Sequence, residues 1–172
     1  MYSWLLSCLE QEYEPLHVLK ESPQGSVRLI RHRESRRRLI LRRFTGNGEV
    51  CRKLLDRSCR HLPLIYEAAE QGGENLVIEE FIEGNTLAFL LQGALFSQAE
   101  TTQIVRQLCQ ALWVLHSMEA VHRDINPENI ILRGGDAVLI DFDAARLYKP
   151  EQSVDTHVLG TTSFAAPEQY GL

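Results

Sequence analysis

Two carboxylates and an amide in the second half of the chain have residue types and a spacing that suit metal and proton chemistry. Asp124 and Asn129 belong to the segment HRDINPEN, and Asp141 ends the apolar run AVLID. The runs NIILR and AVLID are joined by two glycines, which predicts a β-hairpin that returns Asp141 to the side of the first segment. Carboxylate and amide oxygens are ligands for Mg²⁺, which also binds phosphate oxygens. Each residue alone is also typical of a turn cap, but the three together favour a metal and proton-transfer site.

Three segments in this order resemble the motifs of protein kinases. HRDINPEN resembles the catalytic loop H-R-D-x-x-x-x-N, IDFD resembles the D-F-G magnesium motif, and GTTSFAAPEQYG resembles the end of an activation segment with its A-P-E. The chain looks most similar to bacterial Ser/Thr protein kinases, and the resemblance covers nearly its whole length. It implies ATP and Mg²⁺ as cofactors and a protein hydroxyl as the substrate.

The resemblance also implies roles for single residues of these motifs. Asp124 would orient or deprotonate the substrate hydroxyl, and Arg123 would brace the activation segment. Asn129 and Asp141 would hold the magnesium ions that bridge the ATP phosphates. Asn126 stands where Ser/Thr kinases have a lysine that contacts the transferring phosphate. Losing one such preorganised group typically lowers a rate by about 10²–10³-fold.

Two further residues of the same motifs follow from the resemblance. His122 is expected to pack in the core rather than act as a free catalytic histidine. Asp143 replaces the glycine of D-F-G. Aspartate tolerates a left-handed backbone better than most residues, although less freely than glycine does.

The glycine-rich and adenine-contacting positions of the first half are altered. KESPQGSV takes the place of the glycine-rich loop, and only Gly25 and Val27 match it. Ile40 replaces a small alanine above the adenine. Glu79 stands at the back of the adenine pocket, where an apolar residue is usual, and is expected either to pair with Arg42 or to face solvent. Glu80 completes the expected set of nucleotide contacts.

The phosphate-binding lysine of the family is also replaced. LILR aligns with V-A-I-K and puts Arg42 at the lysine position, where it would pair with a helix glutamate, expected to be Glu49. Arg43 takes this role if the register differs by one residue. Arginine keeps the charge of lysine but not its geometry.

The expected fold is α+β and protein-kinase-like. Residues 1–84 are predicted to form an N-lobe with a five-stranded antiparallel sheet and one helix, and residues 85–172 an incomplete, mainly helical C-lobe. A capping box of Ser97 and Glu100 predicts the start of a long helix. This helix carries an apolar stripe of Ile104, Leu108, Ala111, Leu112 and Leu115. The sequence ends shortly after Glu168, so the stripe is expected to lack its cover and to drive self-association.

Composition limits the classes of partner. The chain has 172 residues, 44% of them hydrophobic and 24% charged, and a net charge of −5, which argues against nucleic acid as a partner. The arginine-rich stretch 28–43 has no interleaved aromatic residues and reads as a solvated hairpin. No apolar run is long enough to span a membrane. Four scattered cysteines without a C-x-x-C pair suit reduced thiols and a cytoplasmic location.

Three functions remain open on these residues. The first is an ATP-dependent protein serine/threonine kinase domain, impaired or incomplete. The second is a pseudokinase that serves as a binding or scaffold module, favoured by Arg42, Asn126 and Asp143. The third is a small-molecule kinase of the aminoglycoside or choline type, whose H-G-D-x-x-x-x-N motif resembles HRDINPEN, although such kinases lack the activation segment.

Overall fold

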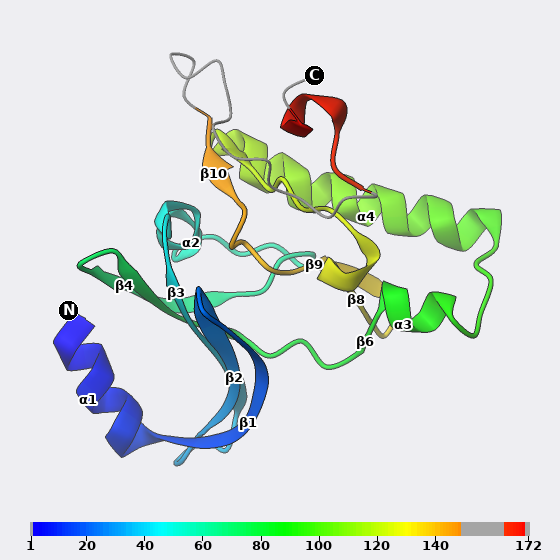
Figure 1. Cartoon of the computed structure of the whole chain (residues 1–172). Helices are drawn as coiled ribbons and strands as arrows, with labels where there is room; N and C mark the ends of the chain where they lie inside the picture. The colour runs from blue at the N-terminus through cyan, green and yellow to red at the C-terminus, as the bar shows by residue number, and fades with distance from the viewer. Residues whose placement is uncertain (1, 149–163, 171–172) are drawn as a thin grey trace. The chain divides into compact units, whose positions relative to one another are not determined.

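A computed structural model describes residues 2–148 and 164–170, which divide into two compact units. Unit 1 consists of residues 2–58 and 64–81, and unit 2 of residues 59–63, 82–148 and 164–170. Figure 1 gives the course of the chain through the elements of each unit. The chain therefore passes from unit 1 into unit 2 at residues 59–63 and then returns to unit 1.

Unit 1 is built on one antiparallel sheet. Its strands lie in the order β1 (Tyr13–Ser22), β2 (Gly25–His32), β3 (Arg38–Thr45), β5 (Glu74–Glu80) and β4 (Ile65–Gln71). The helix α2 (Glu49–Leu54) buries Val50, Cys51 and Leu54. The predicted five-stranded antiparallel sheet with its helix is confirmed.

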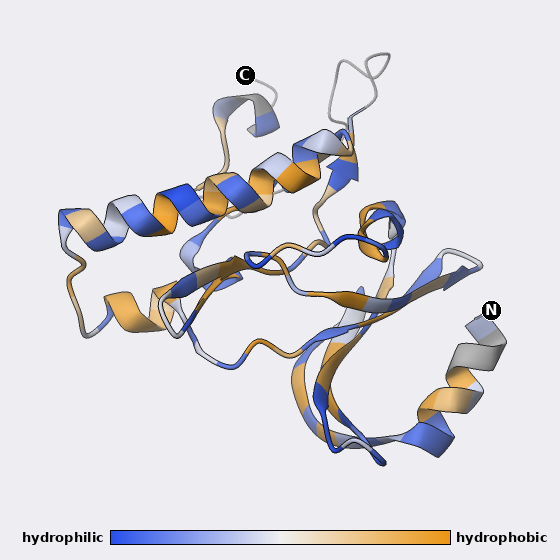
Figure 2. Ribbon diagram, turned by 180° about the vertical axis from the view of Figure 1, so that it is seen from behind, coloured by the Kyte–Doolittle hydropathy of each residue, from blue (hydrophilic) through white to orange (hydrophobic). Residues whose placement is uncertain are grey.

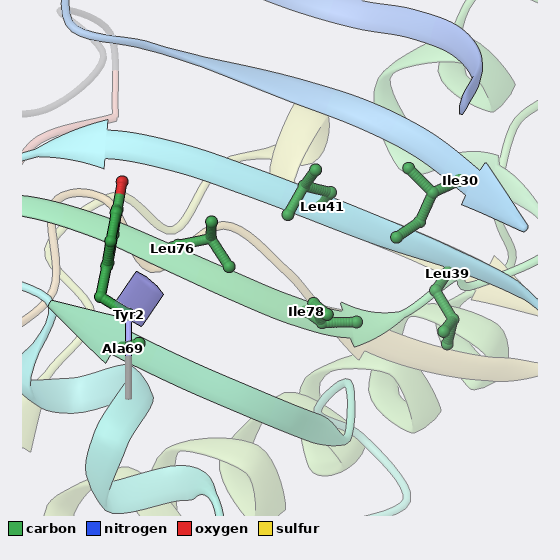
Figure 3. Packing of buried hydrophobic residues seen from close by; sticks show 7 residues of the cluster. All are labelled: Tyr2, Ile30, Leu39, Leu41, Ala69, Leu76 and Ile78. Atoms are coloured by element: carbon green, nitrogen blue, oxygen red, sulfur yellow. The ribbon is translucent and has the colours of Figure 1, made fainter. Parts of the chain in front are cut away.

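A second helix of unit 1, α1 (Tyr2–Glu12), was not expected from the sequence. Its Tyr2 ring lies on the same side of the sheet as six side chains from β2, β3, β4 and β5 (Figure 3), namely Ile30, Leu39, Leu41, Ala69, Leu76 and Ile78. The Tyr2 hydroxyl donates to the Glu74 carboxylate, which also accepts from Arg43 Nη2 at 2.9 Å. Side chains of a strand alternate between faces, so Ile40, Arg42, Val77 and Glu79 lie on the opposite face and are buried as well.

Unit 2 combines a long helix with two small sheets. Its helices are α3 (Leu87–Leu91) and α4 (Gln98–Ser117). One sheet has the order β6 (Asn85–Thr86), β8 (Ile130–Arg133), β9 (Asp136–Leu139), and the other pairs β10 (Arg146–Leu147) with β7 (Ala120–Val121). The predicted capping box of Ser97 and Glu100 is present at the start of α4. The predicted hairpin between NIILR and AVLID is β8–β9.

The apolar stripe of α4 is covered in part, which corrects the expectation that it lies open. Ala111 and Leu115 are fully buried, and Ile104, Leu108 and Leu112 are half-buried. The reason is that α4 packs against β9 and β7 of its own unit. Apolar and polar residues alternate along the α4 ribbon (Figure 2), and its exposed large apolar side chains are Val105 and Trp113. Among the described residues, no helix is both long and apolar enough to cross a membrane.

Candidate active site

The loop between β7 and β8 is closed by a hydrogen bond between two predicted site residues. Asn129 Nδ2 donates to Asp124 Oδ2 at 2.8 Å and to the Asp124 carbonyl oxygen at 2.9 Å. Asn129 is buried and Asp124 is half-buried. Because the amide nitrogen of Asn129 faces Asp124, its amide oxygen points away from Asp124. The structure thus brings together the predicted base and one predicted metal ligand.

Asn126, which stands where the family has a lysine, caps the turn that follows it in the chain. Its side chain is only 4% exposed, and its Oδ1 accepts from the backbone N–H groups of Glu128 at 2.9 Å and Asn129 at 3.2 Å. Asn126 is the N-cap of the 3-10 turn Pro127–Asn129, a position that favours asparagine. As a buried neutral cap, Asn126 does not supply the cation of the aligned lysine, and the structure shows it in a structural role in the loop. Its assignment as a catalytic residue stays a prediction.

Ile140 joins this loop to the predicted magnesium motif. Its N–H donates to the Asn129 carbonyl oxygen at 2.9 Å, and its carbonyl oxygen lies 3.2 Å from His122 Nε2. The Asp124 N–H donates to His122 Nδ1 at 3.4 Å, so the geometry fits a neutral imidazole that carries its proton on Nε2. His122 is 1% exposed and lies edge-to-face on Phe142, with ring centroids 5.6 Å apart, which confirms that it packs in the core.

Two residues of these motifs have a left-handed backbone. Arg123 has a φ of 69° and Asp141 has a φ of 68°. Such a backbone is uncommon outside glycine, and it persists where the surroundings impose it, often at functional sites. Asp141 Oδ1 accepts from the N–H of Asp143 at 3.1 Å, which stabilises the turn locally. Asp141 is thus flanked by the bonds of Ile140 on one side and by its own bond from Asp143 on the other.

Gln169 is a site residue that sequence reasoning missed. Its Nε2 donates to the Arg123 carbonyl oxygen at 2.7 Å, and its Oε1 accepts from the Ala166 N–H at 3.0 Å. One half-buried amide therefore ties the segment that contains A-P-E to the strained residue before Asp124. No spacing rule points to this bond, because its partners are 46 residues apart in the chain.

The donor atoms of unit 2 fit a magnesium ion. The Asn129 amide oxygen and the Asp141 carboxylate offer oxygen atoms of the kind that Mg²⁺ binds, and the bond between Ile140 and Asn129 joins the two segments. Within the part of the chain that the structure describes, no group of three or more His, Cys, Asp or Glu could hold a metal. Mg²⁺ usually takes one or two carboxylates and completes its shell with phosphates and water, so an amide and a carboxylate suffice.

In unit 1, Arg42 forms an ion pair inside the sheet. Its Nη1 lies 3.5 Å from Glu79 Oε1, and the two residues are 5% and 4% exposed. This pairing resolves the two alternatives for Glu79 and corrects the expected partner of Arg42. Glu49 begins α2, where its N–H donates to Asn47 Oδ1 at 2.9 Å, and among the described residues it makes no ion pair with Arg42.

The remaining predicted nucleotide contacts line the same sheet. Gly25 opens β2, where a Cβ atom would lie 2.1 Å from the Arg43 carbonyl oxygen, so the close approach of β3 alone requires glycine there. Val27 pairs with Arg42 across β2 and β3, and Ile40, which is buried, pairs with Glu79. The Glu80 carboxylate accepts from the Leu64 N–H at 3.3 Å.

Comparisons with known proteins agree with these motifs. Residues 28–170 match the family model of the protein kinase domain. The chain is 30% identical over 172 residues to the serine/threonine-protein kinase PknA of Nostoc sp., which covers 94% of this chain and 28% of that protein. It is 33% identical over 139 residues to the serine/threonine-protein kinase D of Synechocystis sp., covering 76% of this chain and 27% of that protein. For serine/threonine-protein kinase 36 of Pongo abelii the identity is 28% over 169 residues, covering 92% of this chain and 13% of that protein. The chain therefore spans less than a third of the length of these relatives.

Proposed function

The chain belongs to the protein kinase family, and on this premise we propose that it is an impaired ATP-dependent protein serine/threonine kinase domain. Its relatives in Nostoc, Synechocystis and Pongo abelii are named as serine/threonine-protein kinases. These names favour a protein kinase over a small-molecule kinase. The proposed cofactors are ATP and Mg²⁺, and the proposed substrate is a protein with a Ser or Thr hydroxyl.

One observation carries the proposal: the hydrogen bond from Asn129 Nδ2 to Asp124 Oδ2 at 2.8 Å, in a loop whose Asn129 carbonyl also binds Ile140. It joins the proposed base to one proposed metal ligand, and the Ile140 bond ties in the segment that carries the second proposed ligand, Asp141. If the three residues were only turn caps, each would serve its own turn, and the two segments would have no need to meet.

In the proposed reaction, Asp124 accepts a hydrogen bond from the substrate hydroxyl, orients its oxygen toward the γ-phosphate and takes its proton. The bond from that oxygen to phosphorus forms as the bond to the β-phosphate oxygen breaks. Asn129 and Asp141 would hold Mg²⁺, which neutralises charge on the phosphates when it is bound. His122 and Ile140 keep the two protein segments in register while this occurs.

The substitutions support an impaired enzyme. Asn126 supplies no cation, because it is a buried neutral cap, and such a loss typically lowers a rate by about 10²–10³-fold. Arg42 is held by Glu79 in the sheet rather than by a helix glutamate. These two observations favour a second candidate function, a pseudokinase that binds nucleotide or protein without efficient transfer.

Self-association and the cellular location are further proposals. The exposed Val105 and Trp113 of α4 are the side chains we propose for self-association, in place of the covered stripe. The four cysteines are free thiols, which supports the proposed cytoplasmic location. The net charge of −5 gives no reason to propose nucleic acid.

A phosphotransfer assay with a generic protein substrate tests the function. We expect slow Mg²⁺-dependent transfer to Ser or Thr, lowered by about 10²–10⁴-fold in Asp124→Asn, the range typical of a lost general base. Nucleotide affinity should change little, because the Asn129 bond to an amide oxygen at position 124 can persist. Nucleotide binding without any transfer selects the pseudokinase. Transfer at the same rate in Asp124→Asn contradicts the assignment of the base.

A further inference from the structure

Glu79 provides the negative charge that protein kinases normally take from a helix. In this family the β3 cation forms an ion pair with a glutamate of the helix that follows β3, and the position of that helix then controls activity. In this chain the carboxylate next to the β3 cation Arg42 comes from β5, the neighbouring strand. The source of the counter-charge has moved from a helix to the sheet.

The register of the strands explains why this pair forms. Ile40 pairs with Glu79 and Arg42 pairs with Val77, so Arg42 and Glu79 are diagonal neighbours on one face of the sheet. Diagonal neighbours across antiparallel strands are within reach of long side chains. Both side chains are about 95% buried, with exposed fractions of 6% and 5%. A charge buried to this extent requires an opposite charge nearby.

The element that would carry the usual partner is poorly suited to hold a cation. Helix α2 has only six residues, and Glu49 is the first of them. A helix of this length has little stability of its own. The backbone ladder of β3 and β5, by contrast, runs from the pair Leu39–Glu80 to the pair Thr45–Glu74. The backbone position of Glu79 is therefore set by its pairing with β3.

We propose that Glu79 is the positioning residue of Arg42, and that it fixes the phosphate-binding cation from within the sheet, so that α2 has no control over it. This inference rests on the proposed function, because it gives Arg42 the task of binding nucleotide phosphates. A kinase domain of this kind is not switched by movement of its helix.

Titration of the full chain with Mg²⁺–ATP by calorimetry tests the proposal, with the melting temperature of each variant recorded in parallel. Glu79→Gln keeps the shape of the side chain and removes its charge, and Glu79→Asp keeps the charge. Glu70→Gln makes the same chemical change at an exposed position of β4 and serves as the matched control. Glu49→Gln tests the competing account, in which the helix glutamate holds the cation.

We expect Glu79→Gln to weaken nucleotide binding about tenfold, which corresponds to about 1.4 kcal/mol, and Glu79→Asp to recover most of the loss. Glu70→Gln and Glu49→Gln should stay within about twofold of the wild type. A purely structural role would lower the melting temperature of Glu79→Gln without changing the affinity of its folded fraction. Unchanged or tighter binding by Glu79→Gln, or an equal loss in Glu49→Gln, overturns the proposal.

A double-mutant cycle of Arg42→Gln and Glu79→Gln on the unfolding equilibrium needs no nucleotide and covers the case in which Glu79→Gln folds poorly. We expect the double variant to be more stable than the sum of the two single losses predicts. Coupling in a chain that binds no nucleotide supports the pairing of Glu79 with Arg42 and contradicts the proposed function. Absence of coupling overturns the inference even if nucleotide binds.

Discussion

The loop between β7 and β8 of unit 2 and strands β3 and β5 of unit 1 preserve the family pattern to different degrees. In unit 2, Asp124, Asn129 and Asp141 retain their types. Asn129 donates to Asp124, and the Ile140 N–H, one residue before Asp141, donates to the Asn129 carbonyl oxygen. In the strands, an arginine and a glutamate replace the usual residues and form a buried pair with each other. Unit 2 keeps the acidic and amide residues of the motifs but not the lysine that Asn126 replaces, and unit 1 keeps a cation but not the lysine.

The difference shows how each kind of site tolerates change. The loop depends on backbone groups and on two left-handed residues, Arg123 and Asp141, so a substitution there disturbs several bonds at once. The strands are held by a regular ladder of backbone hydrogen bonds. The usual side chains on one face can therefore be replaced by a pair of opposite charge without altering that ladder. A change that breaks the loop should therefore cost more than an equivalent change in the sheet.

Asn126→Lys tests whether the loop depends on its cap. We expect this variant to lose about 1–2 kcal/mol of stability, since removing an N-cap typically costs about 0.5–2 kcal/mol and lysine cannot remain buried there. Asn126→Ser, which can still accept from the same N–H groups, should lose less than about 0.5 kcal/mol. Thermal unfolding measures both. A fully stable Asn126→Lys chain with faster phosphotransfer would restore the alignment-based role and remove the contrast between the regions.

Gln169→Glu tests the contact between the A-P-E segment and the loop. The carboxylate keeps the acceptor for the Ala166 N–H but cannot donate to the Arg123 carbonyl oxygen. We expect kcat to fall about two- to tenfold, the value of a hydrogen bond worth about 0.5–1.5 kcal/mol, with KM for ATP unchanged. Gln103→Glu on the exposed side of α4 is the control. Equal effects of the two variants, or a loss confined to KM, would argue against a positioning role for Gln169.

The parts of the molecule that follow from local patterns could be predicted from the sequence. The capping box of α4, the β8–β9 hairpin and the catalytic motif each depend on residues close together in the chain. Helix α1 was not predicted, because the segment lacks an acidic first turn and a basic last turn, the signals that usually mark helix ends. Its stability comes instead from packing Tyr2 on a sheet formed later in the chain.

Side-chain directions at the site were harder to infer than residue positions. The alignment showed that position 126 lacks the lysine of the family. It did not show that the Asn126 side chain turns inward to cap the loop. It left two alternatives for Glu79, because the distance to Arg42 depends on the strand register. The bond between Gln169 and Arg123 depends on tertiary structure, which no local pattern records.

The smallest effect is expected on the face of the unit 1 sheet that α1 covers, where the Tyr2 hydroxyl donates to Glu74. Burial, followed by the bond to Glu74, raises the pKa of Tyr2 above its ordinary 10.0. The bonds from Tyr2 and Arg43 lower the pKa of Glu74 below its ordinary 4.5. Ionised Glu74 therefore contributes stability above pH 4.5, and this stability is lost as the pH falls through the lowered pKa. Neutral Tyr2 contributes stability below pH 10.0, and this stability is lost as the pH rises through the raised pKa.

We expect Tyr2→Phe to lower the stability of unit 1 by less than about 1 kcal/mol at neutral pH, since the pair is partly exposed. The variant should also flatten the loss of stability below pH 4.5 and above pH 10. Hydrogen exchange of the β3 and β5 amides across this range measures the effect, with Tyr148→Phe in unit 2 as the control. The same pH profile in wild type and Tyr2→Phe would show that this bond does not hold α1.

Nucleotide binding with and without Mg²⁺, compared between the wild type and Asp141→Asn, tests the central claim most directly. Asparagine tolerates the left-handed backbone of position 141, so the variant changes the ligand and leaves the turn. We expect the wild type to bind ATP more tightly when Mg²⁺ is present and Asp141→Asn to lose that gain, a change of about tenfold or more, or 1.4 kcal/mol. Mg²⁺-dependent binding that is the same in both proteins would contradict the assignment of Asp141 and Asn129 as the metal ligands.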